Sequence, residues 1–198
     1  MGVKVFGIGL SRTGSLSLRD YMNASGYSSV HYVAKPHWLG IPQEIVKFCE
    51  GHDFVNDAPV SIYFEELSQA FPGSKFINTT RDLGSWLKSC SQHFVRNLKE
   101  GKPYRATLKY RELLYGCNEY NRTKFTKAFH QHKQKVSEFS KKNNVLTLRL
   151  EDRGKVGLLK DFLDDDDLSP DYPHVNDLAD RTLRRAMMRR SERVTGWV

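Results

Sequence analysis

Apolar and β-branched residues occur in five short runs, each five to seven residues long. Runs of this length and composition are typical of β-strands. The sequence therefore predicts strands over 3–8, 28–33, 53–57, 75–80 and 144–150.

Between these runs the apolar residues recur every three or four positions, which is the spacing of one face of an α-helix. Pro42 suits the first turn of the second of these segments. The loop-like composition of residues 99–107 predicts an irregular connection there. The predicted helices cover 15–24, 42–49, 60–71, 83–98, 118–142 and 155–163.

Strands and helices thus alternate along the whole chain. This alternation indicates an α/β fold, a three-layer sandwich in which helices cover both faces of a central parallel sheet. The 198 residues suffice for one domain, so we expect residues 1–198 to form a single unit.

The composition narrows the classes of partner. The formal net charge of +8 favours anionic ligands. The chain has neither a stretch long enough to span a membrane nor a secretory signal. Cys49, Cys90 and Cys117 have neither metal-ligand spacing nor an even disulfide count. We therefore expect a cytoplasmic protein with free thiols, no bound metal and no membrane partner; the sequence does not indicate an oligomeric state.

The turn at residues 9–15, GLSRTGS, joins the first predicted strand to the first helix. A glycine turn at a helix N-terminus exposes backbone amides that bind anions. A nucleotide triphosphatase loop would need lysine where Ser15 stands, and a dinucleotide fingerprint would need glycine where Arg12 stands. What remains is a loop in which Arg12 and the neighbouring hydroxyls surround one tetrahedral anion.

This turn resembles the phosphosulfate-binding loop of sulfotransferases that use 3′-phosphoadenosine 5′-phosphosulfate (PAPS). Leu16 departs from the family, which often has a second Thr there. The resemblance implies a fold like that of P-loop NTPases, PAPS as co-substrate and no metal. The residues that it assigns to donor binding are Ser11, Arg12, Thr13, Gly14, Ser15 and Ser17.

A second signature of the same family is an arginine after a later strand, with a serine eight positions further on, which together hold the 3′-phosphate. Arg81 follows the strand at 75–80, and Ser89 stands at that spacing. The alternative is that Arg81 and Asp82 form only a local ion pair or helix cap. The segments 56–77 and 171–177 also resemble a small-sulfotransferase family with many bacterial members.

Sulfuryl transfer needs positive charge at the leaving oxygen and a base for the acceptor's proton. Arg12 suits the first role. Asp57 and His31 are the candidate bases. Cytosolic sulfotransferases have a lysine-x-histidine-x-proline element where this chain has an acid before Pro59. The alternative roles are a helix cap for Asp57 and a core position for His31.

The sequence does not identify the acceptor of the sulfuryl group. A hydroxyl or an amine of a small molecule or carbohydrate is compatible with it. Segments 35–50 and 92–120 are expected to line its site. Trp38, Trp86 and Trp197 are candidates for stacking on the nucleotide. The alternatives are a small-molecule kinase of the same fold, a family member without activity, or a non-enzymatic protein that binds anions or nucleic acid through its basic tail at 181–193. Nucleic acid is disfavoured because no reader motif accompanies the charge.

Overall fold

A computed structural model describes residues 3–33, 35–99 and 105–173. In this part of the chain, five strands form one sheet in the order β2-β3-β1-β4-β5, and every pair of neighbours is parallel. All five predicted strands are present. Their bounds are β1 Val5–Gly7, β2 Ser29–His31, β3 Phe54–Asn56, β4 Lys75–Thr80 and β5 Asn144–Arg149.

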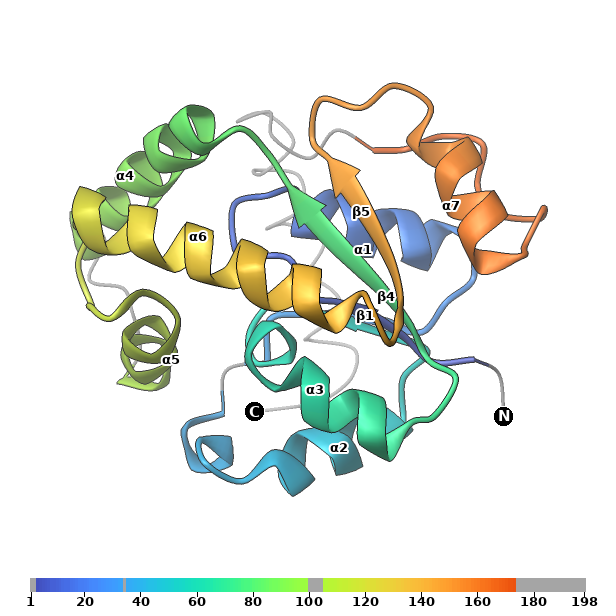
Figure 1. The fold of residues 1–198 in the computed structure, drawn as a ribbon, viewed down its shortest axis with the longest axis horizontal. Helices are drawn as coiled ribbons and strands as arrows, with labels where there is room; N and C mark the ends of the chain where they lie inside the picture. Colours follow the sequence, from blue (N-terminus) through green and yellow to red (C-terminus); the bar gives the residue numbers. More distant parts are fainter. Residues whose placement is uncertain (1–2, 34, 100–104, 174–198) are drawn as a thin grey trace, which may run out of the picture.

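Helices cover both faces of this sheet, as the alternation predicts (Figure 1). A short 3-10 helix, Pro36–Trp38, precedes the second α-helix. The α-helices are α1 Ser15–Ala24, α2 Pro42–Glu50, α3 Val60–Ala70, α4 Leu83–Lys99, α5 Arg105–Tyr115, α6 Arg122–Phe139 and α7 Lys155–Leu163. The α/β fold class and its three layers are confirmed.

Alternate residues of the strands point to opposite faces, and both sets are buried. Phe6, Val55 and Phe76 belong to a core that α2, α3 and α6 complete. Their neighbours Val5 and Phe54 belong to a second core with α1 and α7. Burial on both faces is the usual condition of an all-parallel sheet, and it explains why the strands read as continuous apolar runs.

A third core of α4, α5 and α6 residues packs around Leu10, just after β1. Trp86 of α4 is fully buried there, and its Nε1 donates to the carbonyl of Ser11 at 3.0 Å. Trp38 is also buried, in the core beneath α2 and α3. Both tryptophans are therefore packing residues, and Trp86 also holds the loop after β1.

The loop predicted over 99–107 is wrong from Arg105 on, because α5 begins there. Residues 105–115 contain neither Gly nor Pro and are rich in Leu, Arg and Lys, which favour helices. The helix predicted from residue 118 begins only at Arg122. The Oδ1 atom of Asn121 accepts from the amide of Lys124 at 3.0 Å and so caps the first turn.

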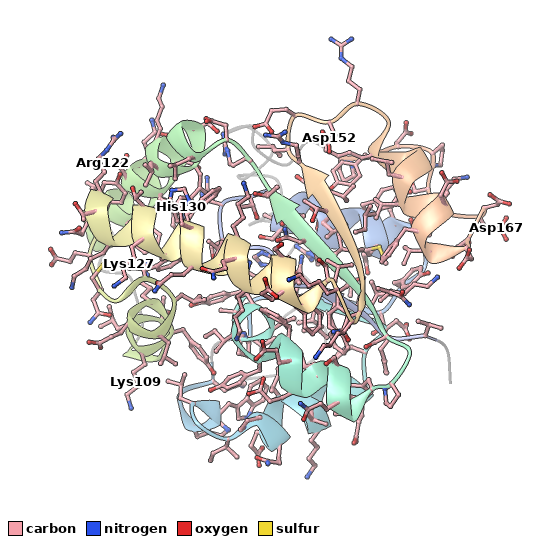
Figure 2. The ribbon with its side chains drawn as sticks, in the orientation of Figure 1. Lys109, Arg122, Lys127, His130, Asp152 and Asp167 are labelled. Carbon is pink, nitrogen blue, oxygen red and sulfur yellow. The ribbon has the colours of Figure 1, made fainter. Side chains whose placement is uncertain are left out.

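The exposed face of α6 is rich in lysine and arginine. Lys109 of α5 and Arg122 and Lys127 of α6 are exposed and point away from the fold (Figure 2). Among the described residues, no helix combines the length and apolar character needed to cross a bilayer.

Gly9 lies where the chain leaves β1 and passes against β4. A Cβ atom there would lie 2.3 Å from the hydroxyl and 2.4 Å from the carbonyl oxygen of Thr79. The second contact is with backbone, so the loop itself would have to move.

We expect Gly9→Ala to lower the free energy of unfolding by about 2 kcal/mol, as overpacking does. Gly157→Ala in α7 is the matched control, because a Cβ there meets nothing within 4 Å and alanine favours a helix. Urea denaturation of the two variants measures the difference. Equal stabilities would contradict the close approach.

Candidate active site

Three non-glycine residues just beyond neighbouring strand ends have left-handed backbone conformations. Arg12 follows β1 with φ 73°, Tyr32 follows β2 with φ 57°, and Asp57 follows β3 with φ 67°. Such conformations are unfavourable for residues with a Cβ and concentrate at functional sites. The carboxyl ends of parallel strands lie together along one end of the sheet, which we call the carboxyl edge. The three strained residues are therefore located where ligands bind in folds of this class.

The carboxylate of Asp57 holds several groups of this edge together through hydrogen bonds. Asp57 is 3% exposed, and its carboxylate accepts from Ser11 Oγ at 2.6 Å, Ser15 Oγ at 2.9 Å and the amide of Ala58 at 2.7 Å. His31 Nε2 lies 3.2 Å from Asp57 Oδ2 and 3.1 Å from Ser15 Oγ. The two candidate bases, which lie far apart in the sequence, are thus in direct contact.

This environment keeps Asp57 ionised. Burial alone would raise the pKa of the Asp57 carboxyl, but hydrogen bonding and charge from His31, with the Ser11 hydroxyl and the Ala58 amide, hold it below its ordinary value. The carboxylate therefore acts as a permanent acceptor that fixes His31 and the loop.

The loop hydroxyls make internal bonds, whereas several of its amides do not. Thr13 Oγ1 donates to the carbonyl of Leu10 at 2.5 Å and lies 2.7 Å from Thr79 Oγ1. Gly14 has φ 99° and precedes α1, and Ser17 is buried in the first turn of that helix. Among the described residues, the amides of Thr13, Gly14 and Ser15 donate no hydrogen bond. Three amides at a helix N-terminus form a ready anion site.

The arginine of the loop meets the second predicted signature. Arg12 Nε donates to Ser89 Oγ at 3.2 Å, and Arg81 Nη1 donates to the carbonyl of Arg12 at 3.3 Å. Arg81 Nε also donates to Ser85 Oγ at 3.0 Å. Arg12, Arg81 and Ser89 therefore lie together at the ends of β1 and β4.

Asp82, the alternative partner of Arg81, caps α4 instead. Its carboxylate accepts from the amide of Ser85 at 2.6 Å and from that of Gly84 at 3.2 Å. These bonds, the one from Ser85 first, hold the pKa of Asp82 below its ordinary value. The acidic neighbour is thus occupied with helix capping.

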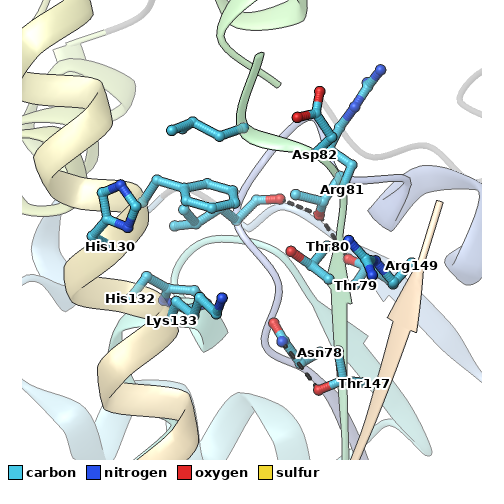
Figure 3. A pocket seen from close by; sticks show the side chains of 14 residues that line it. Asn78, Thr79, Thr80, Arg81, Asp82, His130, His132, Lys133, Thr147 and Arg149 are labelled. Atoms are coloured by element: carbon cyan, nitrogen blue, oxygen red, sulfur yellow. Dashed lines mark hydrogen bonds between the residues drawn. The ribbon is translucent and has the colours of Figure 1, made fainter. Parts of the chain in front are cut away.

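A cavity of about 460 Å³ lies on the α6 side of the same edge (Figure 3). It is lined by side chains of β4, β5 and α6, among them Asn78, Thr147, Arg149 and Lys133. It also reaches Thr13 and Arg81, from the side opposite α1. The cavity is not lined by the segments 35–50 and 92–120 that were expected to surround an acceptor.

Sequence reasoning missed two residues of the site. Thr79 of β4 supports the loop through its contact with Thr13. The sequence feature that could have indicated it is the presence of a polar residue inside a mainly buried strand. Tyr115 of α5 is buried beside Ser11. No sequence pattern indicated this residue, because α5 itself was not predicted.

The comparisons with known proteins follow this geometry. Residues 4–181 match the model of the family described as a sulfotransferase domain. The chain belongs to the sulfotransferase family. A crystal structure of a sulfotransferase from Alicyclobacillus acidocaldarius has a similar fold, with a TM-score of 0.54 and 15% identity over 94% of this chain and 91% of that one. No curated protein sequence matches the chain significantly.

The P-loop-like fold expected from the resemblance is therefore confirmed, and membership of the family supports sulfuryl transfer as the type of reaction. The basic tail at 181–193, on which the nucleic-acid alternative depended, lies outside the described residues, and so does Trp197, the third candidate for stacking on the nucleotide.

Asp57→Asn should lower the free energy of unfolding near pH 7 by about 3 kcal/mol, because the buried hydrogen bonds lose their anionic acceptor. A carboxyl whose folded pKa is depressed stabilises the fold above its unfolded pKa of about 4, and this contribution disappears as the pH falls through the folded value. The gap between wild type and variant should therefore narrow below about pH 4. Denaturation across the pH range measures it, with the exposed Asp167→Asn as control; a gap independent of pH would contradict the role of the charge.

Proposed function

We propose that this sulfotransferase takes its sulfuryl group from PAPS and transfers it to a hydroxyl or amine of a small-molecule or carbohydrate acceptor. The observation that carries the proposal is the meeting of Arg12, Arg81 and Ser89 beside the open amides of the loop. One bisphosphorylated nucleotide has two anionic ends, and this edge has a cationic group for each.

The amides of residues 13–15 and the guanidinium of Arg12 are assigned to the end that carries the sulfuryl group. They would stabilise the negative charge that builds on the bridging oxygen as its bond to sulfur breaks. Arg81 and Ser89 are assigned to the 3′-phosphate, for which the fork of an arginine is well suited. Arginine and amides supply the positive charge, so no metal is assigned a step.

The contact between His31 and Asp57 suggests that the two residues have different roles in proton transfer. A carboxylate only accepts, so Nε2 of His31 presents its hydrogen to Asp57. In the neutral tautomer this leaves Nδ1 with a lone pair that can take the acceptor's proton. The side chain of His31 is 22% exposed, against 4% for Asp57, so an acceptor can reach only the histidine readily. We assign His31 as the base and Asp57 as the residue that positions it.

Adenosine 3′,5′-bisphosphate, the product of the donor, should raise the melting temperature more than ATP does. Arg81→Ala should weaken its binding by about 2 kcal/mol, roughly thirtyfold in Kd, because a charged hydrogen-bond donor is lost. Arg122→Ala, an exposed arginine of α6, removes the same charge elsewhere and is the control. Equal stabilisation by ATP and the bisphosphate would exclude the proposed donor.

His31→Asn should slow sulfuryl transfer about a hundredfold or more in an acceptor screen with labelled donor. It should leave binding of the bisphosphate unchanged, since the donor is assigned to other residues. His52→Asn is the control. His52 precedes β3 at the amino-terminal ends of the strands, far from the carboxyl edge, and its carbonyl accepts from Lys4 Nζ. If the His31 variant keeps its rate while Asp57→Asn loses it, the two roles are reversed.

A further inference from the structure

Arg111 of α5 is a buried cation. The residue is 5% exposed, and its guanidinium lies over the ring of Phe94, 4.1 Å from the centroid. A hydrogen bond runs from its Nη1 to the carbonyl of Asn118 at 3.5 Å, the limit of such a contact. Within the described ranges, no carboxylate lies within ion-pair distance of it.

Two tyrosines connect Arg111 to the catalytic edge. Burial raises the pKa of Tyr32, while the charges of Asp57 and Arg111 act on it in opposite directions. Burial also raises the pKa of Tyr115, and the charge of Asp57 adds to the effect. The geometry agrees with this link. Phe94, whose ring lies under the Arg111 guanidinium, has its centroid 5.7 Å from that of Tyr115. Tyr115 in turn lies 6.2 Å from Trp86, whose Nε1 donates to the carbonyl of Ser11.

Tyr115 adds a second unused donor. It is 3% exposed, and its hydroxyl has no hydrogen bond of ordinary geometry in the described part of the chain, although it lies beside Ser11. Arg111 and Tyr115 are four positions apart on α5, so their side chains share one face of the helix. Buried donors without acceptors are rare in native proteins and call for an explanation.

Packing alone explains Arg111 poorly. A contact with an aromatic face repays only part of the cost of removing a guanidinium from water. A methionine could cover Phe94 without that cost. Retaining an unpaired charge at a functional edge is reasonable if a ligand supplies the missing anion.

We propose that Arg111 and Tyr115 bind an anionic group of the acceptor, a carboxylate in particular. The inference rests on the proposed function and narrows the acceptor to a molecule that bears both a carboxylate and the reacting hydroxyl or amine. The planar fork of arginine matches a carboxylate. The donor's phosphates have Arg12 and Arg81, so Arg111 is left for the other substrate.

The position of α5 agrees with this role. Tyr110, the neighbour of Arg111, donates from its hydroxyl to the carbonyl of Lys35 at 2.9 Å. This bond joins the two segments, 35–50 and 92–120, that the sequence assigned to the acceptor, and Arg111 lies inside the second of them.

The test compares wild type with Arg111→Met, which keeps the apolar stem, and Arg111→Lys, which keeps the charge without the fork. The probes are two pairs that differ in charge: 4-hydroxybenzoate with 4-hydroxybenzamide, and glucuronate with glucuronamide. Calorimetric titration is done with and without saturating adenosine 3′,5′-bisphosphate. In at least one pair, wild type should bind the carboxylate about tenfold tighter than the amide. The methionine variant should lose this preference, and the lysine variant should keep part of it.

Stability provides a readout that is independent of any ligand. Removing an unpaired buried charge should leave the melting temperature of Arg111→Met equal to or above that of wild type. A clear fall would mean that Arg111 serves the fold, and it would overturn the proposal.

Two binding results would also overturn it: no preference for the carboxylate in either pair, or a methionine variant that binds PAPS more weakly but the bisphosphate equally well. The second result would place Arg111 on the sulfuryl group of the donor. Failure of wild type to bind the bisphosphate would count against the proposed donor instead, since the titrations without nucleotide still decide whether Arg111 selects a carboxylate.

Discussion

The carboxylate of Asp57 is the interaction on which the edge of the sheet depends. It is buried and ionised, and it accepts bonds from the loop after β1 and interacts with His31 at the end of β2. Three strands that are adjacent in space, but separated by helices in sequence, are thus joined by one side chain. A buried charge of this kind is tolerated only when it is fully hydrogen-bonded, and here the hydroxyls of Ser11 and Ser15, the amide of Ala58 and His31 satisfy it.

This arrangement also explains the composition of the loop. The hydroxyls of Ser11 and Ser15 are directed to Asp57, and that of Thr13 to Leu10 and Thr79. Their bonds shape the turn and leave backbone amides open for an anion. Trp86 holds the same turn from α4 through the carbonyl of Ser11. The loop is therefore preorganised, so little free energy is lost in ordering it when a ligand binds.

Much of this could be predicted where local signals agree. The strand at 75–80 has the predicted bounds, because Pro72 and Gly73 precede it and a charged pair follows. The resemblance to PAPS-dependent sulfotransferases also predicted that Arg12 and Arg81 bind one nucleotide, and the two residues are in contact in the structure. The α5 helix escaped notice because its apolar face, which includes Tyr110 and Tyr115, is narrow and because no capping residue marks its start. Contacts such as Thr13 with Thr79, or Arg111 with Phe94, depend on tertiary packing that no local pattern encodes.

The order of the strands separates the two tasks of a transfer reaction. Arg81 follows β4, on one side of β1, whereas His31 and Asp57 follow β2 and β3, on the other. The loop after β1 lies between them, so a group bound there would have Arg81 on one side and, on the other, the pair of His31 and Asp57, to which we assign proton transfer. An in-line displacement needs the leaving and attacking oxygens on opposite sides of the transferred atom. A parallel sheet with β1 at its centre provides these two sides through its topology, and only the side chains at the strand ends have to supply the chemistry.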